Sequence, residues 1–422
     1  MKIGKVTSQT TSLITSAVQM GIERNLKILI VDASFRDEMM KKAFLQDESN
    51  DELIKKIKYG RIFMSKNKHG ANLFELVQKY GFNIEDIMDF SSNINPFGAS
   101  PKALDYVRQN IDKLSIYPDP EYRNLLDTLS LYCKTKPENI ILGAGATGLI
   151  SAFIAYINPK KAMLVIPAYS EYEAELNKLK NSETFYHVLK KENDFFIDTD
   201  LLISEINQNN IELLIMCSPN NPTGSVIANE QMIHLLSNTN CHVLVDETYV
   251  EFTDTEKFSS TKLCSKFNKL FVIRSTSKFF AVPGIRLGYG ISSNTGFLEH
   301  YNSFANLWGI NIVASMMGEI MFGDTDFIRD CYEKISNERK YLKDSLEKLK
   351  DLKVYPTFGN FILCEIVSRK TDAGELYERL ISKAAAIRNC SNFKTLDKYF
   401  FRICVLRHEQ NEFLIQQLNE IF

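Results

Sequence analysis

Short apolar runs alternate with amphipathic helical patterns along most of the chain, from about residue 69 onward. Most of the runs are continuous and rich in Val, Ile or Leu, which is typical of strands buried on both faces of a sheet. They span Ile140–Leu142, Ala162–Ile166, Leu213–Cys217, His242–Val245, Leu270–Ile273 and Leu287–Ile291. Helical patterns such as Asn229–Ser237 fit between them. The alternation predicts an α/β fold with a mostly parallel sheet.

After Phe322 the pattern changes to a long charged helix, Asp326–Leu349, followed by shorter strands around Val354–Ile366 and Phe400–Val405. This part is typical of a smaller α+β domain. A chain of 422 residues is also too long for one hydrophobic core. We therefore expect an atypical N-terminal extension (1–66), an N-terminal arm with part of the small domain (67–115), a large domain (116–322) and a C-terminal small domain (323–422).

The first 66 residues have a pattern of their own. A Ser/Thr-rich run, Val6–Ser16, leads into a predicted helix, and Lys27–Ala33 is a predicted buried strand. This order resembles the opening of ParA/MinD-type ATPases, but Val6–Thr11 lacks the glycines and the lysine of a phosphate-binding loop. We therefore expect a packing or oligomerisation appendage here rather than a nucleotide site.

The overall composition excludes several classes of partner. The net charge is −2, from 50 basic and 52 acidic residues, so no broad field favours nucleic acid or a membrane surface. The eight cysteines form no CxxC pair, which favours buried thiols in a reducing compartment over disulfides or a metal site. No run of about 20 apolar residues occurs. We expect a soluble, cytoplasmic protein without a metal.

Two motifs follow predicted strands and suit a planar, phosphorylated ligand. The glycine-rich turn Gly143–Gly148 precedes a helix, so backbone N–H groups and the helix dipole can hold a phosphate. A glycine-rich turn alone more often only reverses the chain direction and binds no phosphate. Tyr169 comes just after the next strand, where its ring can stack on a flat ligand.

The segment Arg274–Tyr289 contains the most informative chemistry. Lys278 is flanked by hydroxyl residues and followed eight positions later by Arg286, which suits an imine-forming amine beside a bound phosphate. Asp246 ends an earlier strand, at the edge where open α/β sheets bind ligands, although an isolated aspartate there is more often a helix cap.

Together these motifs resemble the fold-type I pyridoxal-5′-phosphate (PLP) enzymes, the aspartate aminotransferase superfamily. The resemblance runs from His69 to the C-terminus and is carried by the ordered motifs NNPTG, DETY, STSK and GIRLGY. It implies the PLP-dependent transferase fold, with a mostly parallel seven-stranded sheet in the large domain. It also implies that Lys278 carries PLP as a Schiff base and that Asp246 pairs with the pyridine nitrogen.

The same resemblance assigns the remaining contacts to the cofactor. Asn221 and Tyr249 would contact its phenolate oxygen, so that Lys278, Asp246 and Tyr249 are the expected catalytic residues. Tyr169 would stack on the ring. The cofactor phosphate would be held by Ala146, Thr147, Ser275 and Arg286, together with the partner subunit's Tyr117. The last contact implies a homodimer with shared active sites.

Within this superfamily the chain most resembles threonine-phosphate decarboxylase of cobalamin biosynthesis. The likeness rests on His69-Gly-Ala-Asn72 and on the segment DFSSNINP that begins at Asp89. It implies that His69, Asn93 and Arg388 bind the substrate phosphate and that Arg402 binds the carboxylate, with Asn221 beside it. Two separated arginines suit a substrate with two anionic ends.

Plainer structural roles are also consistent with some of these residues. His69 could belong to an arm, Asn93 to a turn and Arg388 to a surface salt bridge. Ala71, Thr248 and Gly148 also depart from the family pattern. We therefore expect a decarboxylase of O-phospho-L-threonine or O-phospho-L-serine, with an aminotransferase of the histidinol-phosphate type as the alternative. A non-catalytic scaffold is the third possibility.

Overall fold

The computed structural model describes residues 2–5, 28–31 and 70–422. The chain divides into two units, Met1–Lys66 and Asn67–Phe422. In the first unit, β1 (Lys2–Lys5) pairs in parallel with β2 (Ile28–Val31), which falls inside the predicted strand. The predicted helix of the extension lies outside the described residues.

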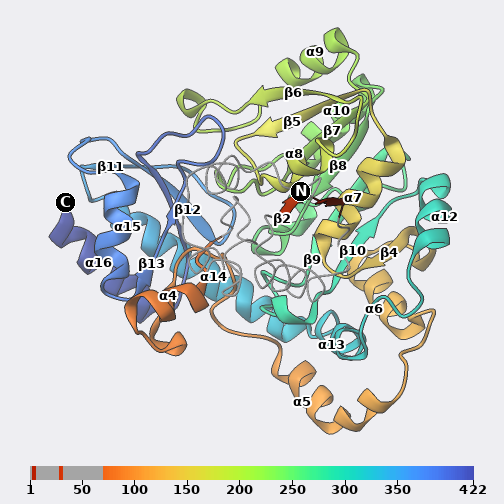
Figure 1. Cartoon of the computed structure of the whole chain (residues 1–422), viewed down its shortest axis with the longest axis horizontal. Coiled ribbons are helices and arrows are strands. Elements are labelled where there is room, and N and C mark those ends of the chain that lie inside the picture. The colour runs from red at the N-terminus through yellow and green to blue at the C-terminus, as the bar shows by residue number, and fades with distance from the viewer. Residues whose placement is uncertain (1, 6–27, 32–69) are drawn as a thin grey trace. The chain divides into compact units, whose positions relative to one another are not determined.

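A seven-stranded sheet forms the centre of the larger part of the second unit (Figure 1). Its strands, in spatial order, are β4 (Ile140–Gly143), β10 (Gly288–Ile291), β9 (Leu270–Ser275), β8 (His242–Asp246), β7 (Leu213–Cys217), β5 (Lys161–Ile166) and β6 (Glu183–Val188). Only β10 runs antiparallel to its neighbours. The predicted fold class is confirmed.

All six predicted strands of this sheet are present, and sequence analysis missed the seventh, β6. This strand forms the edge of the sheet, and its side chains are mostly exposed or half-buried. An edge strand needs no continuous apolar run, because one side of its ladder faces away from the sheet. The signal that located the other strands is therefore absent from Glu183–Val188.

Helices cover both faces of this sheet and bury one large apolar core against it. The helices of this part are α5 (Pro101–Gln109), α6 (Arg123–Cys133), α7 (Ala146–Ile157), α8 (Glu171–Leu176), α9 (Thr199–Asn209), α10 (Asn229–Asn238), α11 (Thr255–Phe258), α12 (Thr295–Phe304) and α13 (Ile312–Met321). All eight cysteines are buried free thiols. No helix in the described ranges is long and apolar enough to cross a membrane.

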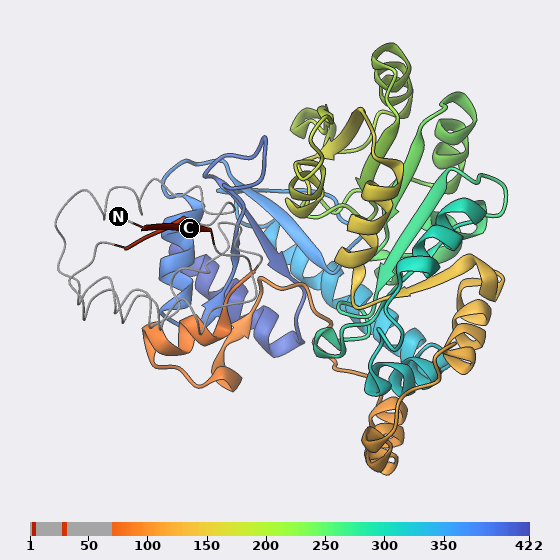
Figure 2. The same cartoon turned by 45° about the vertical axis from the view of Figure 1, so that its right-hand side comes forward.

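A second, antiparallel sheet has the order β11 (Leu352–Val354), β12 (Phe361–Ile366), β15 (Phe400–Cys404) and β14 (Arg388–Asn389). It packs with α14 (Thr325–Leu346), α15 (Ala373–Ile381) and α16 (His408–Ile421) around a second apolar core. Figure 2 shows this part in blue beside the larger sheet. The predicted helix Asp326–Leu349 corresponds to α14, shifted by one to three residues.

The segment that precedes the large sheet is divided between the two cores. Phe90 packs in the second core, next to β3 (Met88–Asp89), which pairs in parallel with β13 (Ala385–Ala386). Helix α4 (Leu73–Tyr80) packs through Leu76 against Ile381 of α15, whereas Ala103 of α5 belongs to the first core. The exact domain boundaries stay a prediction.

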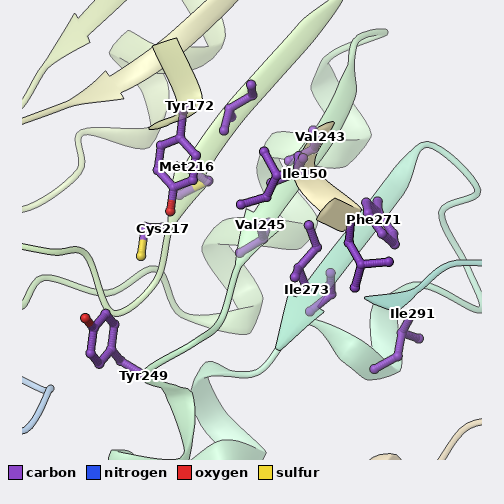
Figure 3. Packing of buried hydrophobic residues seen from close by; sticks show 14 of the residues in the cluster. Ile150, Tyr172, Met216, Cys217, Val243, Val245, Tyr249, Phe271, Ile273 and Ile291 are labelled. Atoms are coloured by element: carbon purple, nitrogen blue, oxygen red, sulfur yellow. The ribbon is translucent and has the colours of Figure 1, made fainter. Parts of the chain in front are cut away.

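The strand register aligns the C-terminal ends of β7, β8 and β9 side by side in the large sheet. Cys217 pairs with Asp246, and Asp246 pairs with Ile273, so the loops after these strands start side by side. Figure 3 shows Tyr172, Cys217 and Tyr249 where the apolar core stops at these strand ends. Open α/β sheets bind ligands at the carboxyl ends of their strands.

Gly288 allows the closest approach between β10 and the turn before α7. A Cβ at Gly288 would lie 2.6 Å from the carbonyl carbon of Gly145 and 2.7 Å from the amide nitrogen of Ala146. These are backbone atoms, which cannot rotate away. We expect Gly288→Ala to displace this turn and to destabilise the protein by about 1–3 kcal/mol, the usual cost of overpacking.

Thermal unfolding of the cofactor-free protein measures this effect. Gly284→Ala is the matched control, because a Cβ at Gly284 meets no atom within 4 Å. An unfolding midpoint for Gly288→Ala equal to that of the control would contradict the steric explanation.

Candidate active site

A cavity of about 580 Å³ opens where the strand ends of the large sheet face β14 and β15. Most of the residues predicted from the sequence line this one cavity. They are Ala146, Thr147, Tyr169, Asn221, Asp246, Tyr249, Ser275, Lys278, Arg286, Arg388 and Arg402. Residues more than 250 positions apart in the chain thus share one site.

The cradle for a phosphate lies at the start of α7. Gly145 precedes the helix with φ 93°, and no side chain caps the helix N-terminus. The guanidinium of Arg286 lies against Gly145, close enough that a Cβ there would collide with it. Ser275 Oγ donates to Ser277 Oγ at 2.9 Å nearby. Uncapped N–H groups beside an arginine form an anion site, so this turn fits a phosphate.

Asp246 is held in one orientation at the end of β8. Its Oδ1 accepts hydrogen bonds from the backbone N–H (2.9 Å) and the hydroxyl (2.5 Å) of Thr248, and its Oδ2 accepts one from the Tyr172 hydroxyl at 2.7 Å. Burial raises the pKa of Asp246, while these hydrogen bonds and Lys278 favour the carboxylate. Sequence analysis missed Tyr172, although it lies only three residues after Tyr169.

Lys278 follows β9 and points at the connecting segment, Asp89–Asn93, which also contacts Arg402 of β15. Its Nζ donates to the backbone oxygen of Ser92 at 2.6 Å. Burial, assisted by the positive charge of Arg402, lowers the pKa of Lys278 to about 8. An amine with this pKa has a useful neutral fraction near pH 7, as a nucleophile needs.

Tyr169 and Tyr249 approach the cavity from different loops. Burial raises the pKa of both hydroxyls, that of Tyr169 to about 12. Asn93 Nδ2 donates weakly to the Tyr249 hydroxyl at 3.4 Å, and its Oδ1 is buried without a partner. Asn93 also has φ 55°, so it combines the turn role and a position beside the site.

Asp89 organises the connecting segment, and sequence analysis did not assign it a role. Its carboxylate accepts hydrogen bonds from the hydroxyls of Ser91 (2.6 Å) and Ser92 (2.5 Å), and Ser91 Oγ accepts one from the backbone N–H of Ala71 at 2.6 Å. These bonds join the HGAN and DFSSNINP motifs. His69 itself lies outside the described residues.

Arg388 and Arg402 are direct cross-strand partners on β14 and β15. Directly opposite residues of an antiparallel pair project from the same face of the sheet. Arg388 donates to the Asn389 oxygen (2.7 Å) and to Asn392 Oδ1 (2.8 Å), and Arg402 donates to Asn221 Oδ1 and to the Ser91 oxygen.

Neither guanidinium has a carboxylate partner among the described residues. Arg402 is only 4% exposed and its Nε has no hydrogen-bond partner. Burial and the nearby charge of Arg402 lower the pKa of Arg388. Within residues 70–422 Arg388 therefore forms no salt bridge, and no carboxylate of that range compensates the two positive charges at the cavity.

Tyr117 does not reach the cavity of its own chain. Its ring stacks on that of Trp308 with centroids 4.2 Å apart, and the residue is 73% exposed. The predicted contact of this tyrosine with a second subunit stays a prediction.

Comparison with known proteins agrees with this site. Residues 85–418 match the family described as aminotransferase class I and II. The chain belongs to this family. A protein of Caldanaerobacter subterraneus that is provisionally named a threonine-phosphate decarboxylase is 36% identical over 363 residues, which cover 85% of this chain and 95% of that protein.

Other members of the aminotransferase class I and II family carry a different name. The histidinol-phosphate aminotransferase of Methanosphaera stadtmanae is 30% identical over 355 residues, 83% of this chain and 95% of that protein. The crystal structure of the histidinol-phosphate aminotransferase from Clostridium acetobutylicum has a TM-score of 0.74 and 32% identity, and the match covers 79% of this chain and 99% of that one. The chain is therefore an aminotransferase-class enzyme, and the scaffold alternative is not supported.

The cofactor of this family is pyridoxal 5′-phosphate. The residues present fit it, because the cavity combines an uncapped helix N-terminus with an arginine, an oriented buried carboxylate and an amine of lowered pKa. The cofactor expectation is thus confirmed at the level of the family.

The lowered pKa of Lys278 predicts its reactivity in the cofactor-free protein. The neutral amine is the reactive form, so acetylation by trace acetic anhydride should rise with pH through about 8 and then level off. Lys398 is an internal control, because its hydrogen bond to Asp372 raises its pKa above the ordinary value. Peptide mapping quantifies both lysines, and parallel profiles for the two would contradict the assignment.

Proposed function

We propose that the protein is a PLP-dependent decarboxylase of a phosphorylated amino acid, which converts O-phospho-L-threonine or O-phospho-L-serine to the aminoalkyl phosphate and carbon dioxide. The proposal is supported by the threonine-phosphate decarboxylase name of the 36% identical relative and by the geometry of the substrate side of the cavity. Arg388 and Arg402 belong to this side, Asn93 lies beside Tyr249, and we include His69 from the sequence motif.

The unpaired arginines Arg388 and Arg402 are the observation that carries this proposal. Like charges placed directly opposite on a sheet destabilise it, unless an anion compensates them. A phospho-amino acid brings two anionic groups, a phosphate and a carboxylate, and each matches one guanidinium fork. We assign the phosphate to Arg388 and the carboxylate to Arg402.

The remaining predicted residues would hold the cofactor. Ala146, Thr147, Ser275 and Arg286 would bind its phosphate, Asp246 its ring nitrogen, Asn221 and Tyr249 its phenolate oxygen, and Tyr169 its ring face, while Lys278 would bond it covalently. The bound cofactor supplies an electron sink for a bond broken at the substrate's α-carbon.

The chain's own groups would decide which bond at the α-carbon breaks. Asn221 and the Ser91 oxygen fix the guanidinium plane of Arg402, so the carboxylate that it binds would take one defined orientation. Decarboxylation also requires a proton at the α-carbon after carbon dioxide leaves. Lys278, with its pKa of about 8, is suited to donate this proton near neutral pH.

An aminotransferase acting on histidinol phosphate is the second candidate. It is supported by the 32% identity to the Clostridium acetobutylicum enzyme over nearly all of that chain. The same phosphate site would serve this substrate, whereas Arg402 would bind the carboxylate of the amino-acid partner.

Product analysis separates the two candidates. The cofactor-loaded enzyme should release carbon dioxide and an aminoalkyl phosphate from phosphothreonine or phosphoserine. It should form little glutamate from 2-oxoglutarate with histidinol phosphate as amino donor. Glutamate formation without carbon dioxide release would establish the aminotransferase instead.

Replacement of Arg388 tests the phosphate assignment. Arg388→Gln should raise the KM for the phosphorylated substrate by about 10-fold to 100-fold, because it removes a charged hydrogen-bond donor. The exposed Arg379→Gln on α15 is the control. Equal KM values for the two variants would exclude Arg388 from substrate binding.

We also propose that the protein is a homodimer in which Tyr117 completes the partner's site. The exposed apolar side chains of Leu114, Ile116, Tyr117 and Leu307 support it, because exposed apolar groups in proximity mark interaction surfaces.

The variants Tyr117→Ala and Lys278→Ala should each have lower catalytic activity than wild type. Mixing the two variants under exchange conditions should restore activity, since one site of each mixed dimer is intact; absence of any recovery would argue against shared sites.

A further inference from the structure

An ion pair lies in the lining of the active-site cavity. Lys394 Nζ lies 2.5 Å from Glu173 Oε1 and 2.6 Å from the Tyr186 hydroxyl, and its ammonium sits 4.1 Å from the centre of the Tyr186 ring. Lys394 and Glu173 both line the cavity. Neither belongs to the set of cofactor and substrate residues described above.

The two charges come from elements that adjoin different sheets. Glu173 is on α8, beside the large sheet, whereas Lys394 is in the loop that leads from β14 to β15. The same loop contains Asn392, which accepts a hydrogen bond from Arg388, and Phe393, whose ring lies 5.1 Å from the Arg388 guanidinium. Lys394 is thus attached to the element that forms the phosphate side of the cavity.

We propose that Lys394 is a specificity-determining residue that binds the distal phosphate of the substrate together with Arg388, and that Glu173 competes with the substrate for it. The inference rests on the proposed function, because it assumes a phosphorylated substrate. It adds a second cation to the phosphate site and a carboxylate that an incoming anion must displace.

The ion pair between Lys394 and Glu173 is weak enough for a substrate phosphate to replace Glu173. The side chains of Lys394 and Glu173 are 48% and 27% exposed, and ion pairs with this much solvent contact contribute little to stability. A phosphate monoester carries nearly two negative charges near pH 7, against one on Glu173. The phosphate is therefore the stronger partner for Lys394.

Lys394 would affect the binding of phosphorylated and unphosphorylated substrates differently. The planar guanidinium of an arginine can donate to two phosphate oxygens, and the ammonium of a flexible lysine can donate to the third. Amino acids without a phosphate would leave Lys394 paired with Glu173 and gain nothing from it. Lys394 would therefore favour phosphorylated substrates over their unphosphorylated counterparts.

Two variants that break the same ion pair distinguish substrate binding from a merely structural role. Lys394→Gln removes the cation, so it should raise the KM for the phosphorylated substrate by about 10-fold, the effect of one charged hydrogen bond. Glu173→Gln removes the competitor, so it should lower that KM. If the pair only held the two sheets together, both variants would change KM in the same direction.

The matched control is Lys398→Gln, since Lys398 pairs with Asp372 and does not line the cavity. Each protein is loaded with cofactor and assayed with phosphothreonine, phosphoserine and histidinol phosphate. The kcat should stay within about twofold of wild type, because an effect confined to uniform binding changes KM alone. Titration of inorganic phosphate, followed by the change in the cofactor's absorbance, gives a dissociation constant that does not require turnover.

The outcomes separate the two proposals. If wild type converts no phosphorylated substrate, the proposed function fails, and the phosphate titration still tests Lys394. If wild type is active but Lys394→Gln matches Lys398→Gln in KM and in phosphate affinity, the inference is overturned while the proposed function stands. Equal shifts of KM in one direction for Lys394→Gln and Glu173→Gln would also overturn it.

Discussion

Two guanidinium groups face each other across β14 and β15 with no acid beside them in the described part of the chain. A folded protein keeps such an unfavourable arrangement only where a ligand supplies the missing charge, because the repulsion weakens the sheet that holds it. The proposed role of this side of the cavity in binding an anionic substrate follows from this pairing. The small antiparallel sheet thus contributes both a packed core and two positively charged side chains to the cavity.

The opposite side of the cavity has the complementary organisation. There the large sheet presents a carboxylate, Asp246 at the end of β8, and an amine, Lys278 in the loop after β9, each held by its own hydrogen bonds. Burial shifts the pKa values of the two groups toward neutrality from opposite directions. A site that adjusts one acid and one base in this way is equipped for proton and electron movements at neutral pH.

The two sides are joined by the short segment from Asp89 to Asn93. Its backbone oxygens accept hydrogen bonds from Lys278 on one side and from Arg402 on the other, and Asn360 donates to the oxygen of Asn93 at 3.0 Å. A small shift of this segment would move the Lys278 amine and the Arg402 guanidinium together. Both proposed reactions depend on orientation at one carbon, so the position of this segment would matter for either of them.

Sequence patterns determined the positions of six strands of the large sheet and most of the residues that line the cavity at their ends, because buried parallel strands are continuous apolar runs and these residues follow directly after them. The edge strand β6 had no such run, so it was missed. The cross-strand pairing of Arg388 with Arg402, the support of Asp246 by Tyr172, and the meeting of Lys394 with Glu173 were decided only by the tertiary structure. Each joins side chains whose contact depends on sheet register and loop path, which local sequence does not encode.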